Sequence, residues 1–591
     1  MREWNSFPEV WVLDFEFYAP PGESPGPLCL VAHEVRTGRQ IEHWKDQLRP
    51  SAPPFHLGAD VLVVAYFASA EMGCFLALNW PMPRNLVDLY VEFRNAANGL
   101  RPPSGWGLLG ALDCYGLPGM VRATKDEMRD LAQRGGPYTE DERRELLRYC
   151  AADVDATVRL FEKMCPSIDL PHALLRGQYS GAAVAMMERT GIPVDGVFLA
   201  KLRDRWDTIQ DQLVEKIDEQ YGVFEGRTFK YDRFEAWLTA NGIAWPRLES
   251  GSLSLSDETF RQMAKSDPRV ALLRELRSSL ATMRKINLSV GQDGRNRCLL
   301  SPFQSRTGRN QPSNSKFLFG TSVWLRGLIR PEPGTGLAYI DWQQQEFAIA
   351  AYLSGDAAMI QAYESGDPYI AFAKQAGAVP ESATKQSHGA IRERFKQCSL
   401  AVNYGMGEHS LAQRLGITLI EARDLLRLHH RTFPRFWRWS DGVVDHAQLV
   451  GRLWTVFGWE LHVVRDPNPR SLANFPMQAN GAEMLRLACT HATRGGIRVC
   501  APVHDAVLIE APLAELEAAV EKMQTCMAAA SAAVLGGPEL GTDVELVRRP
   551  DRFMDPRGEA MWCAVEAAIE GEGGAERSTT WSVLTNPPNL L

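Results

Sequence analysis

"IRERFKQCSLAVNYGMG", residues 391–407, contains a row of residues spaced by four: Arg392, Lys396, Leu400 and Tyr404. Four residues advance an α-helix by about 400°, so this row drifts by only about 40° per step. One helical ridge therefore presents two cations and then an aromatic ring. A solvated basic face is the alternative interpretation, but solvated faces rarely end in an aromatic residue followed by glycine.

Acidic residues lie at predicted strand ends on both sides of this helix. The segment "GLAYIDWQQQEFAIAAYLSGD" (336–356) starts as an apolar strand that ends at Asp341 and continues with helical spacing. The segment "VCAPVHDAVLIEAP" (499–512) predicts two short strands around Asp505. Either acid alone could belong to a polar turn. Together they provide the two carboxylates that a two-metal phosphoryl-transfer site requires.

In order and spacing, these three segments resemble motifs A, B and C of family A DNA polymerases, the bacterial polymerase I-like family. The resemblance implies that Asp341 in "DWQQQE" and Asp505 in "VHDA" bind metal. It also implies that Glu346 screens the sugar of the incoming nucleotide. In "RERFKQCSLAVNYG", the resemblance implies that Arg392 and Lys396 bind the phosphates of the incoming nucleotide.

The same ridge would place Leu400, which replaces a usual aromatic residue, near the incoming sugar. Tyr404 would close over the nascent base pair. Motif C of the family usually continues with Glu, whereas this chain has Ala506. Three glutamines, residues 343–345, replace a more mixed segment.

Two further segments resemble DNA-contacting signatures of the family, "SRTGRNQPSN" (305–314) and "RSLANFPMQANGAEM" (470–484). Pro476 suits the first turn of a helix, so we expect Arg470 before that helix and Gln478 within it. "MERTGIPVDG" (187–196) resembles the segment that joins exonuclease and polymerase regions. The resemblance implies the following DNA-binding residues: Arg309, Arg470, Asn474, Gln478 and His504.

A second acidic cluster is predicted near the start of the chain. In the predicted strand "VLDFEF" (12–17), Asp14 and Glu16 point to the same face. The segment from residue 139 to 164 predicts an amphipathic helix that starts near Glu140. Tyr149 and Asp153 lie four apart on it and share a face. A solvated acidic rim is the alternative, but buried carboxylates on an apolar strand suit a shared divalent cation.

"LDFEF" and, about 135 residues later, "YCAADVDAT" resemble the DEDD-type 3'-5' proofreading exonucleases whose last motif carries a tyrosine. The resemblance implies that Asp14, Glu16 and Asp153 bind two magnesium ions and that Tyr149 orients the hydroxide. In "VVAYFASAEMGCF" (63–75) the matching middle acid is Glu71 rather than Asp, which would act through bound water.

In the same middle motif, Phe67 stands where the family usually has Asn. Asp88 in "LVDLY" belongs either to the shell of this site or to a turn cap. Both interpretations stay open on the sequence alone.

The predicted fold class is a multidomain α/β protein, with an RNase H-like exonuclease domain followed by a right-hand polymerase of palm, fingers and thumb. We expect the exonuclease domain over 1–170 and a linker with a mostly helical thumb over 171–295. The palm would occupy 296–380 and 446–591, which includes a C-terminal tail, and the fingers 381–445. The chain before the exonuclease is too short for a 5'-nuclease domain.

Composition limits the location and the partners of the protein. Lys and Arg number 64 against 72 Asp and Glu, a net charge of -8, so basic groups that bind DNA must be local. No apolar run reaches the roughly 18 residues of a membrane span, and the start lacks a signal-peptide core. The eleven cysteines form no CxxC pair, which argues against zinc. We expect a cytoplasmic protein that does not contact membranes.

The predicted function is template-directed DNA synthesis with 3'-5' proofreading in phage genome replication, in the host bacterial cytosol. The expected cofactor is Mg2+, two ions per active site, for which Mn2+ can substitute. The expected partners are primer-template DNA, dNTPs and phage replication proteins such as a helicase, a primase and a single-strand binding protein.

Two alternatives remain, a metal-dependent 3'-5' exonuclease with a non-catalytic nucleic-acid-binding C-terminal region, and a non-catalytic replication scaffold. Some polymerases of this kind belong to phages that replace adenine with 2-aminoadenine. No motif in this chain reads the extra amino group, so base preference stays open.

Overall fold

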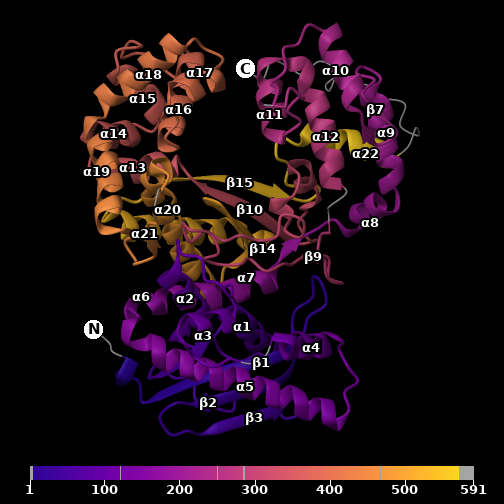
Figure 1. The fold of residues 1–591 in the computed structure, drawn as a ribbon, viewed down its shortest axis with the longest axis vertical. Coiled ribbons are helices and arrows are strands. Elements are labelled where there is room, and N and C mark those ends of the chain that lie inside the picture. The colour runs from indigo at the N-terminus through magenta and orange to yellow at the C-terminus, as the bar shows by residue number, and fades with distance from the viewer. Residues whose placement is uncertain (1–3, 120–121, 249, 284–286, 465–466, 571–591) are drawn as a thin grey trace. The chain divides into compact units, whose positions relative to one another are not determined.

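The computed structural model describes residues 4–119, 122–248, 250–283, 287–464 and 467–570 (Figure 1). Packing divides the chain into two units. The first contains 1–191, 299–311 and 337–546, and the second contains 192–298, 312–336 and 547–591. The domain borders expected from the sequence stay predictions, and most of the expected C-terminal tail lies outside the described residues. Within those described ranges, no helix is long and apolar enough to cross a membrane.

The first unit begins with a five-stranded sheet of order β3-β2-β1-β4-β5. Its strands are β1 (Glu9–Tyr18), β2 (Gly26–Glu34), β3 (Gln40–Trp44), β4 (Val61–Ala65) and β5 (Leu86–Asp88). β1 pairs antiparallel with β2 and parallel with β4. All five side chains of β4 are buried, as expected for a parallel strand that is covered on both faces.

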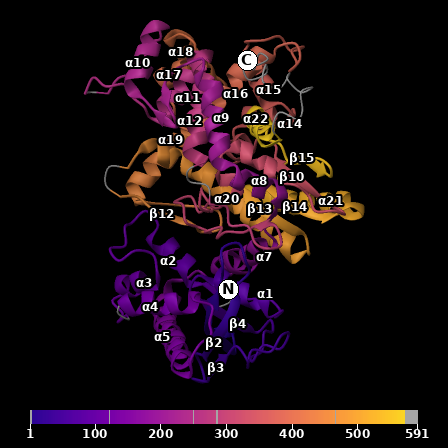
Figure 2. The same cartoon turned by 90° about the vertical axis from the view of Figure 1, so that its right-hand side faces the viewer.

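Helices cover both faces of this sheet. Figure 2 shows α1 (Ala68–Ala77) and α5 (Glu140–Met164) on opposite sides of it. Val10 and Val12 of β1 pack in the core with α5, and Trp11 and Leu13 pack in the core with α1. This alternation follows from the two-residue period of a strand. The other helices here are α2 (Leu89–Ala97), α3 (Leu108–Cys114) and α4 (Arg122–Gln133), with η1 (Trp4–Ser6) before β1.

The long helix α5 starts where the sequence predicts. Thr139 Oγ1 accepts a hydrogen bond from the backbone N–H of Glu142, and Glu142 Oε2 accepts one from the N–H of Thr139. This capping box pairs two N–H groups that would otherwise lack partners at the helix start. The predicted helix start at Glu140 is therefore confirmed.

A second sheet of order β13-β14-β10-β15 lies in the C-terminal part of the first unit. Its strands are β10 (Thr335–Trp342), β13 (Arg498–Val503), β14 (Ala506–Pro512) and β15 (Thr542–Arg548). Val503 pairs with Ala506, so His504 and Asp505 form a two-residue hairpin turn, and the two predicted strands around Asp505 are confirmed. Helices α20 (Pro469–Arg494) and α21 (Leu516–Leu535), which follows η7 (Leu513–Glu515), pack against each other and on these strands (Figure 1).

The start of α20 corrects one prediction. The helix begins at Pro469 rather than near Pro476, because Pro469 itself occupies the first turn and Asn468 accepts the N–H of Arg470 as N-cap. Pro476 lies inside the helix. Arg470 is therefore helical, and spacing by four places three expected DNA-binding side chains on one helical face: Arg470, Asn474 and Gln478.

A helical region joins β10 to α20. Its helices are α13 (Gln345–Ser354), α14 (Ala357–Glu364), α15 (Pro368–Gln375), α16 (Gly389–Asn403), α17 (Glu408–Leu415), α18 (Leu419–Thr432) and α19 (Pro434–Val450). Aromatic rings fill its core, where Phe372 contacts Phe395, His429 and Phe433 at centroid distances of 4.6 to 5.1 Å. A short hairpin of β11 (Arg452–Trp454) and β12 (Glu460–His462) follows α19.

Hydrogen bonds from helix α2 connect the five-stranded sheet region to the rest of the first unit. Arg94 Nε donates to the carbonyl of Phe303 at 3.1 Å. Asn95 accepts from the N–H of Glu460 at 2.7 Å and donates to the carbonyl of Gly458 at 3.1 Å. The connection along the chain runs through η2 (Cys165–Ser167), α6 (Leu170–Gly177), the π-helix η3 (Gln178–Ala183) and α7 (Val184–Thr190).

The second unit is mostly helical, as predicted for the region after residue 171. It contains α8 (Gly196–Asp204), α9 (Trp206–Asp218), α10 (Tyr231–Ala240), α11 (Asp257–Ser266), α12 (Ala271–Met283) and α22 (Glu559–Glu570). Trp562 of α22 stacks on Phe198 of α8 with ring centroids 4.5 Å apart. Its short elements are β6 (Ile192–Pro193), β7 (Phe224–Glu225), β8 (Thr228–Phe229), β9 (Arg295–Asn296), η4 (Pro268–Val270), η5 (Leu318–Gly320) and η6 (Val323–Leu328).

Candidate functional site

Asp341 lies near the end of β10, between neighbours that also carry acids. On one side, the N–H of Trp342 donates to the carbonyl of Asp505 at 3.3 Å. On the other side, the N–H of Gln343 donates to the carbonyl of Gly541 at 2.9 Å. This pairing brings Asp341 and Asp505 together, as the sequence predicts, although they are more than 160 residues apart in the chain.

The charges around Asp341 favour a cation. Burial, with Asp505 and then Asp543 nearby, raises the pKa of Asp341 to about 7. Burial likewise raises the pKa of Asp505. Oδ1 of Asp341 is buried and has no hydrogen-bond partner among the described residues. Carboxylate oxygens are the ligands that Mg2+ and Mn2+ prefer, so the donor set fits a divalent cation.

Glu346, Tyr404 and Arg309 lie next to these acids. The hydroxyl of Tyr404, the C-cap residue of α16, donates to Oε1 of Glu346 on α13 at 3.1 Å. Burial raises the pKa of Glu346, and the Tyr404 hydrogen bond and the Arg309 charge partly offset that effect. The charge of Arg309 also offsets the raised pKa of Asp505. These three expected residues and Asp505 thus form one electrostatic cluster.

Arg392, Lys396 and Leu400 of the predicted ridge lie in α16, and Tyr404 is its C-cap residue. The first cation of the ridge has a partner that sequence reasoning missed. Arg392 Nε donates to Oδ2 of Asp367 at 2.5 Å, and the guanidinium stands 5.4 Å from the ring centroid of Tyr369. Lys396 Nζ lies 3.9 Å from Glu393. The carbonyl of Leu400 accepts the N–H of Tyr404 at 3.3 Å. Asp367 could have been found only as a helix N-cap before Pro368.

The expected DNA-binding residues of α20 extend from this ridge. The stem of Arg470 packs against Gly405, where an added Cβ would lie 2.8 Å from Arg470 Cγ. Gly405 also has a φ of +62°, so only glycine suits this close approach. Oδ1 of Asn474 is buried without a hydrogen-bond partner in the described ranges. Gln478 is half-buried on the same helical face.

The remaining expected DNA-binding residue, His504, takes the first position of the β13–β14 turn with a φ of 57°. Its charge partly offsets the raised pKa of Asp505. The turn therefore presents His504 beside a predicted metal ligand.

The acidic cluster near the start of the chain also converges. Glu71 of α1 is 3% exposed, and its Oε2 accepts the N–H of Phe15, between Asp14 and Glu16, at 2.7 Å. Burial first, and then Asp14, raise the pKa of Glu71 well above its ordinary value. Glu16 and Asp153 act in the same direction, so all four carboxylates are close enough to interact.

Tyr149 of α5 completes this cluster through a hydrogen bond with Asp153. Burial and then the charge of Asp153 raise the pKa of the Tyr149 hydroxyl. Cys150, which sequence reasoning missed, donates its thiol to Asp14, with Sγ 3.4 Å from Oδ2 and 3.2 Å from the carbonyl. The small thiol follows the predicted tyrosine in the chain, and no pattern in the sequence marks it.

The oxygens of this cluster match Mg2+ in chemistry. Over the described ranges, however, no three His, Cys, Asp or Glu side chains are already arranged to hold a metal ion. The ligand roles of Asp14, Glu16 and Asp153 therefore stay predictions.

Asp88 acts as a cap. Its Oδ1 accepts the N–H of Phe67 at 3.0 Å and the N–H of Tyr90, at the start of α2, at 3.1 Å. Its Oδ2 accepts the hydroxyl of Ser180 at 2.8 Å. Three donors occupy the carboxylate, which favours the cap over the metal shell.

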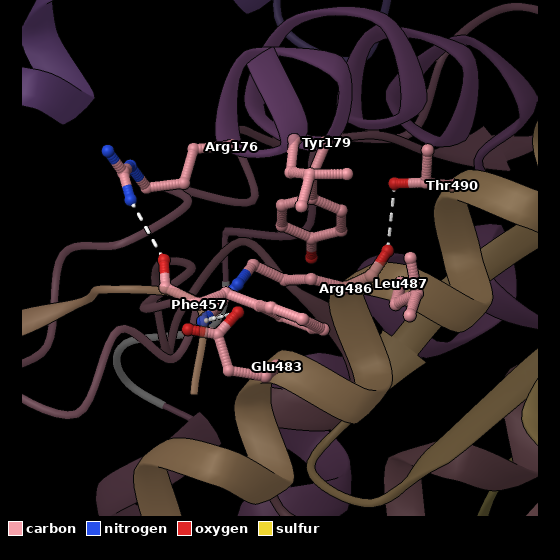
Figure 3. A pocket seen from close by; sticks show the side chains of 8 residues that line it. Arg176, Tyr179, Phe457, Glu483, Arg486, Leu487 and Thr490 are labelled. Atoms are coloured by element: carbon pink, nitrogen blue, oxygen red, sulfur yellow. Dashed lines mark hydrogen bonds and ion pairs between the residues drawn. The ribbon is translucent and has the colours of Figure 1, made fainter. Parts of the chain in front are cut away.

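A small cavity of about 30 Å³ lies away from these acids, between α6, η3 and α20 (Figure 3). Arg176 points its guanidinium at the carbonyl of Phe457, 3.1 Å away, while Glu483 and Arg486 form an ion pair at 2.8 Å. Tyr179 reaches into the space between them (Figure 3). The volume of this cavity suits a single water molecule rather than a nucleotide, so we assign the cavity to packing.

Comparison with known proteins agrees with this geometry. Residues 312–546 match DNA polymerase family A. This segment contains β10, α13, α16, α20 and the β13–β14 turn, which carry Asp341, Asp505 and the Tyr404–Glu346 pair. The segment is similar to the polymerase domain of family A DNA polymerases.

Two relatives match much of the chain. The DNA polymerase I of Chloroflexus aurantiacus is 26% identical over 418 residues, which cover 64% of this chain and 44% of the relative. The DNA polymerase of Mycobacterium phage D29 is 24% identical over 419 residues, which cover 68% of each. The chain thus spans less than half the length of the first relative and about two thirds of the second.

A solved structure shares the fold along nearly the whole chain. The POL domain of Pol1 from M. smegmatis, in complex with DNA primer-template and dNTP, superposes with a TM-score of 0.71. The match covers 91% of this chain and 95% of that domain at 18% sequence identity. At this identity the match describes the fold alone.

Proposed function

We propose that the protein is a template-directed DNA polymerase that extends a primer 3' end and edits it with a 3'-5' exonuclease. The observation that carries the proposal is the cluster of Asp341 and Asp505 with Glu346, Tyr404 and Arg309. The match of residues 312–546 to DNA polymerase family A supports the polymerase half of the proposal. The convergence of Asp14, Glu16, Glu71, Asp153 and Tyr149 supports the editing half.

The polymerase residues divide the work by position. Asp341 and Asp505 would hold two Mg2+ ions, which when bound activate the primer 3'-OH and neutralise charge on the triphosphate. Arg392 and Lys396 donate charge-assisted hydrogen bonds to the phosphates of the dNTP. Tyr404 packs on the nascent pair and holds Glu346 where a ribose 2'-OH would lie.

Primer-template contacts fall to the remaining groups of the cluster. Arg309 and His504 lie beside Asp505 and would contact the primer end and the minor groove. Arg470, Asn474 and Gln478 would follow the template along one face of α20. Because such contacts are largely to phosphates, we expect duplex affinity to fall steeply as salt rises.

In the editing site, Asp14, Glu16 and Asp153 would hold the ions. Tyr149 would orient the attacking hydroxide, since its hydroxyl already bonds to Asp153. Glu71 would stabilise the strand through the Phe15 N–H and meet the ions through water.

A labelled primer-template, incubated with Mg2+ with and without dNTPs, tests both halves. We expect Asp341→Asn to lose extension and keep primer shortening, and Asp14→Asn to lose shortening and keep extension. Asp424→Asn, on the exposed face of α18, is a control that removes an acid outside both clusters. Shortening without extension by the wild type would favour the alternative of an exonuclease with a nucleic-acid-binding C-terminal region.

The relation to the phage D29 polymerase supports a role in phage replication in the host cytosol, beside a helicase, a primase and a single-strand binding protein. Use of 2-aminoadenine nucleotides is a separate proposal without a residue that carries it. To test this preference, the incorporation of dATP and of 2-amino-dATP opposite T is compared at equal concentration. Equal efficiencies would contradict a preference.

A further inference from the structure

The polymerase cluster contains an acidic residue that no motif accounts for. The residue after Asp505 is Ala506, which is fully buried in β14, so this position brings no charge to the site. Asp543, at the start of β15, lies on the other side of β10.

The backbone fixes the place of Asp543 relative to Asp341. β15 is the strand next to β10, opposite the side where β14 pairs. The N–H of Gln343 donates to the carbonyl of Gly541 at 2.9 Å, which ties the end of β10 to the start of β15. The side chain is tied as well, since Gln343 Nε2 donates to Oδ1 of Asp543 at 2.7 Å.

Gln343 therefore links the polymerase motif of β10 to β15 through both its backbone and its side chain. An added Cβ on Gly541 would lie 2.7 Å from Gln343 Oε1, so glycine leaves room for this side chain. The contact holds one oxygen of Asp543 toward Gln343 while the residue stays open to solvent. Asp505, Asp341 and Asp543 thus come from three neighbouring segments of one sheet.

We propose that Asp543, without being a ligand itself, supplies beside the polymerase cation site the charge that Ala506 does not. It is a positioning residue that acts on the cation held by Asp341 and Asp505, and Gln343 orients it. The inference rests on the proposed polymerase function, because that function requires a cation at Asp341.

Two matched variants separate this role from that of an ordinary solvated acid. Asp543→Asn removes the charge and keeps an oxygen that can accept the Gln343 hydrogen bond. Glu545→Gln removes an equal charge two residues along the same strand, where the side chain is also exposed. Asp543→Glu retains the charge with one added methylene.

Manganese binding gives a readout that does not depend on turnover. The full-length chain with Asp14→Ala, which prevents editing, is bound to a primer-template with a dideoxy-terminated primer. Free Mn2+ is measured by electron paramagnetic resonance during titration. We expect Asp543→Asn to weaken Mn2+ binding by about tenfold, as for other groups that orient a metal site.

In the same titration we expect Glu545→Gln to match the parent and Asp543→Glu to restore most of the affinity. An unchanged thermal midpoint for Asp543→Asn would show that the sheet is intact. Equal Mn2+ affinity in the parent and Asp543→Asn, with Asp341→Asn defective, would overturn the inference alone. If Asp341→Asn kept both primer extension and Mn2+ affinity, the proposed function itself would be overturned.

Discussion

The hydroxyl of Tyr404 donates a hydrogen bond to Oε1 of Glu346, which joins the end of α16 to the first turn of α13. Removing that hydroxyl by Tyr404→Phe leaves Glu346 free to rotate away from the nucleotide sugar. A hydrogen bond that is partly open to solvent contributes about 1 kcal/mol, which corresponds to about a fivefold effect. We therefore expect the ratio of kcat/KM for dNTP over rNTP to fall about fivefold.

A matched control exists for this variant. Tyr352 donates to Glu364 at 3.3 Å, so Tyr352→Phe removes the same kind of bond from a tyrosine that is not an expected site residue. It should leave sugar discrimination unchanged, while Glu346→Ala should lower it further than Tyr404→Phe. Unaltered discrimination in both Tyr404→Phe and Glu346→Ala would refute a sugar-screening role for this pair.

A buried ion pair joins helices α2 and α6. Arg176 on α6 bonds to Glu92 on α2 through both arms, at 2.8 and 2.7 Å, and the side chains are 3% and 4% exposed. Arg176→Met leaves the Glu92 carboxylate buried without its partner, which costs about 3–5 kcal/mol of unfolding free energy. Urea unfolding of the full chain measures the loss.

Two comparisons test that explanation. Arg134→Met breaks a surface pair with Glu142, which solvent screens, and should change stability little. The double variant Arg176→Met/Glu92→Leu removes both charges and should recover most of the loss. A double variant as unstable as Arg176→Met would mean that the loss came from packing and from the hydrogen bond to the Phe457 carbonyl rather than from the unpaired charge.

Local signals were sufficient for the parts of the fold that short segments determine. The Thr139 and Glu142 capping box, the two-residue turn at Asp505 and the shared face of Asp14 and Glu16 depend on a few consecutive residues each. The start of α20 could also have been found, since Asn468 and Pro469 form a cap signal that competes with Pro476.

Pairings between distant segments could not be predicted in this way. Asp543 meets Gln343 across 200 positions, and Asp367 meets Arg392 only after α15 and α16 pack together. The backbone conformation of Phe67 could not be predicted either. Its φ of 69° is a conformation that Asn tolerates and Phe does not favour, and the ring contact with Tyr90 at 5.0 Å helps to hold it.

Variants of Asp88 test whether this residue acts as a helix cap or belongs to the exonuclease metal site. Asp88→Ala leaves the N–H groups of Phe67 and Tyr90 without an acceptor, which should cost about 1–3 kcal/mol of unfolding free energy. Asp88→Asn keeps an acceptor oxygen and should retain primer shortening near the wild-type rate. Shortening lost in Asp88→Asn at unchanged stability would instead assign Asp88 to the exonuclease site.

His429 should make the helical region between β10 and α20 sensitive to acid. It is 1% exposed, its Nδ1 accepts the indole N–H of Trp437 at 3.1 Å, and burial lowers its pKa to about 3. In the unfolded chain its pKa is about 6.5. Between these values the unfolded chain binds a proton that the folded chain does not, so stability falls as pH falls below about 6.5.

The loss from His429 is about 2 kcal/mol between pH 7.5 and pH 5, because each full pH unit in this window contributes about 1.4 kcal/mol. His429→Gln retains an acceptor for Trp437 and cannot titrate, so its urea-unfolding free energy should fall about 2 kcal/mol less than wild type over the same range. His409→Gln, on the exposed face of α17, should follow the wild type. Parallel pH profiles for the wild type and His429→Gln would show that His429 is protonated, or accessible to protons, in the folded protein.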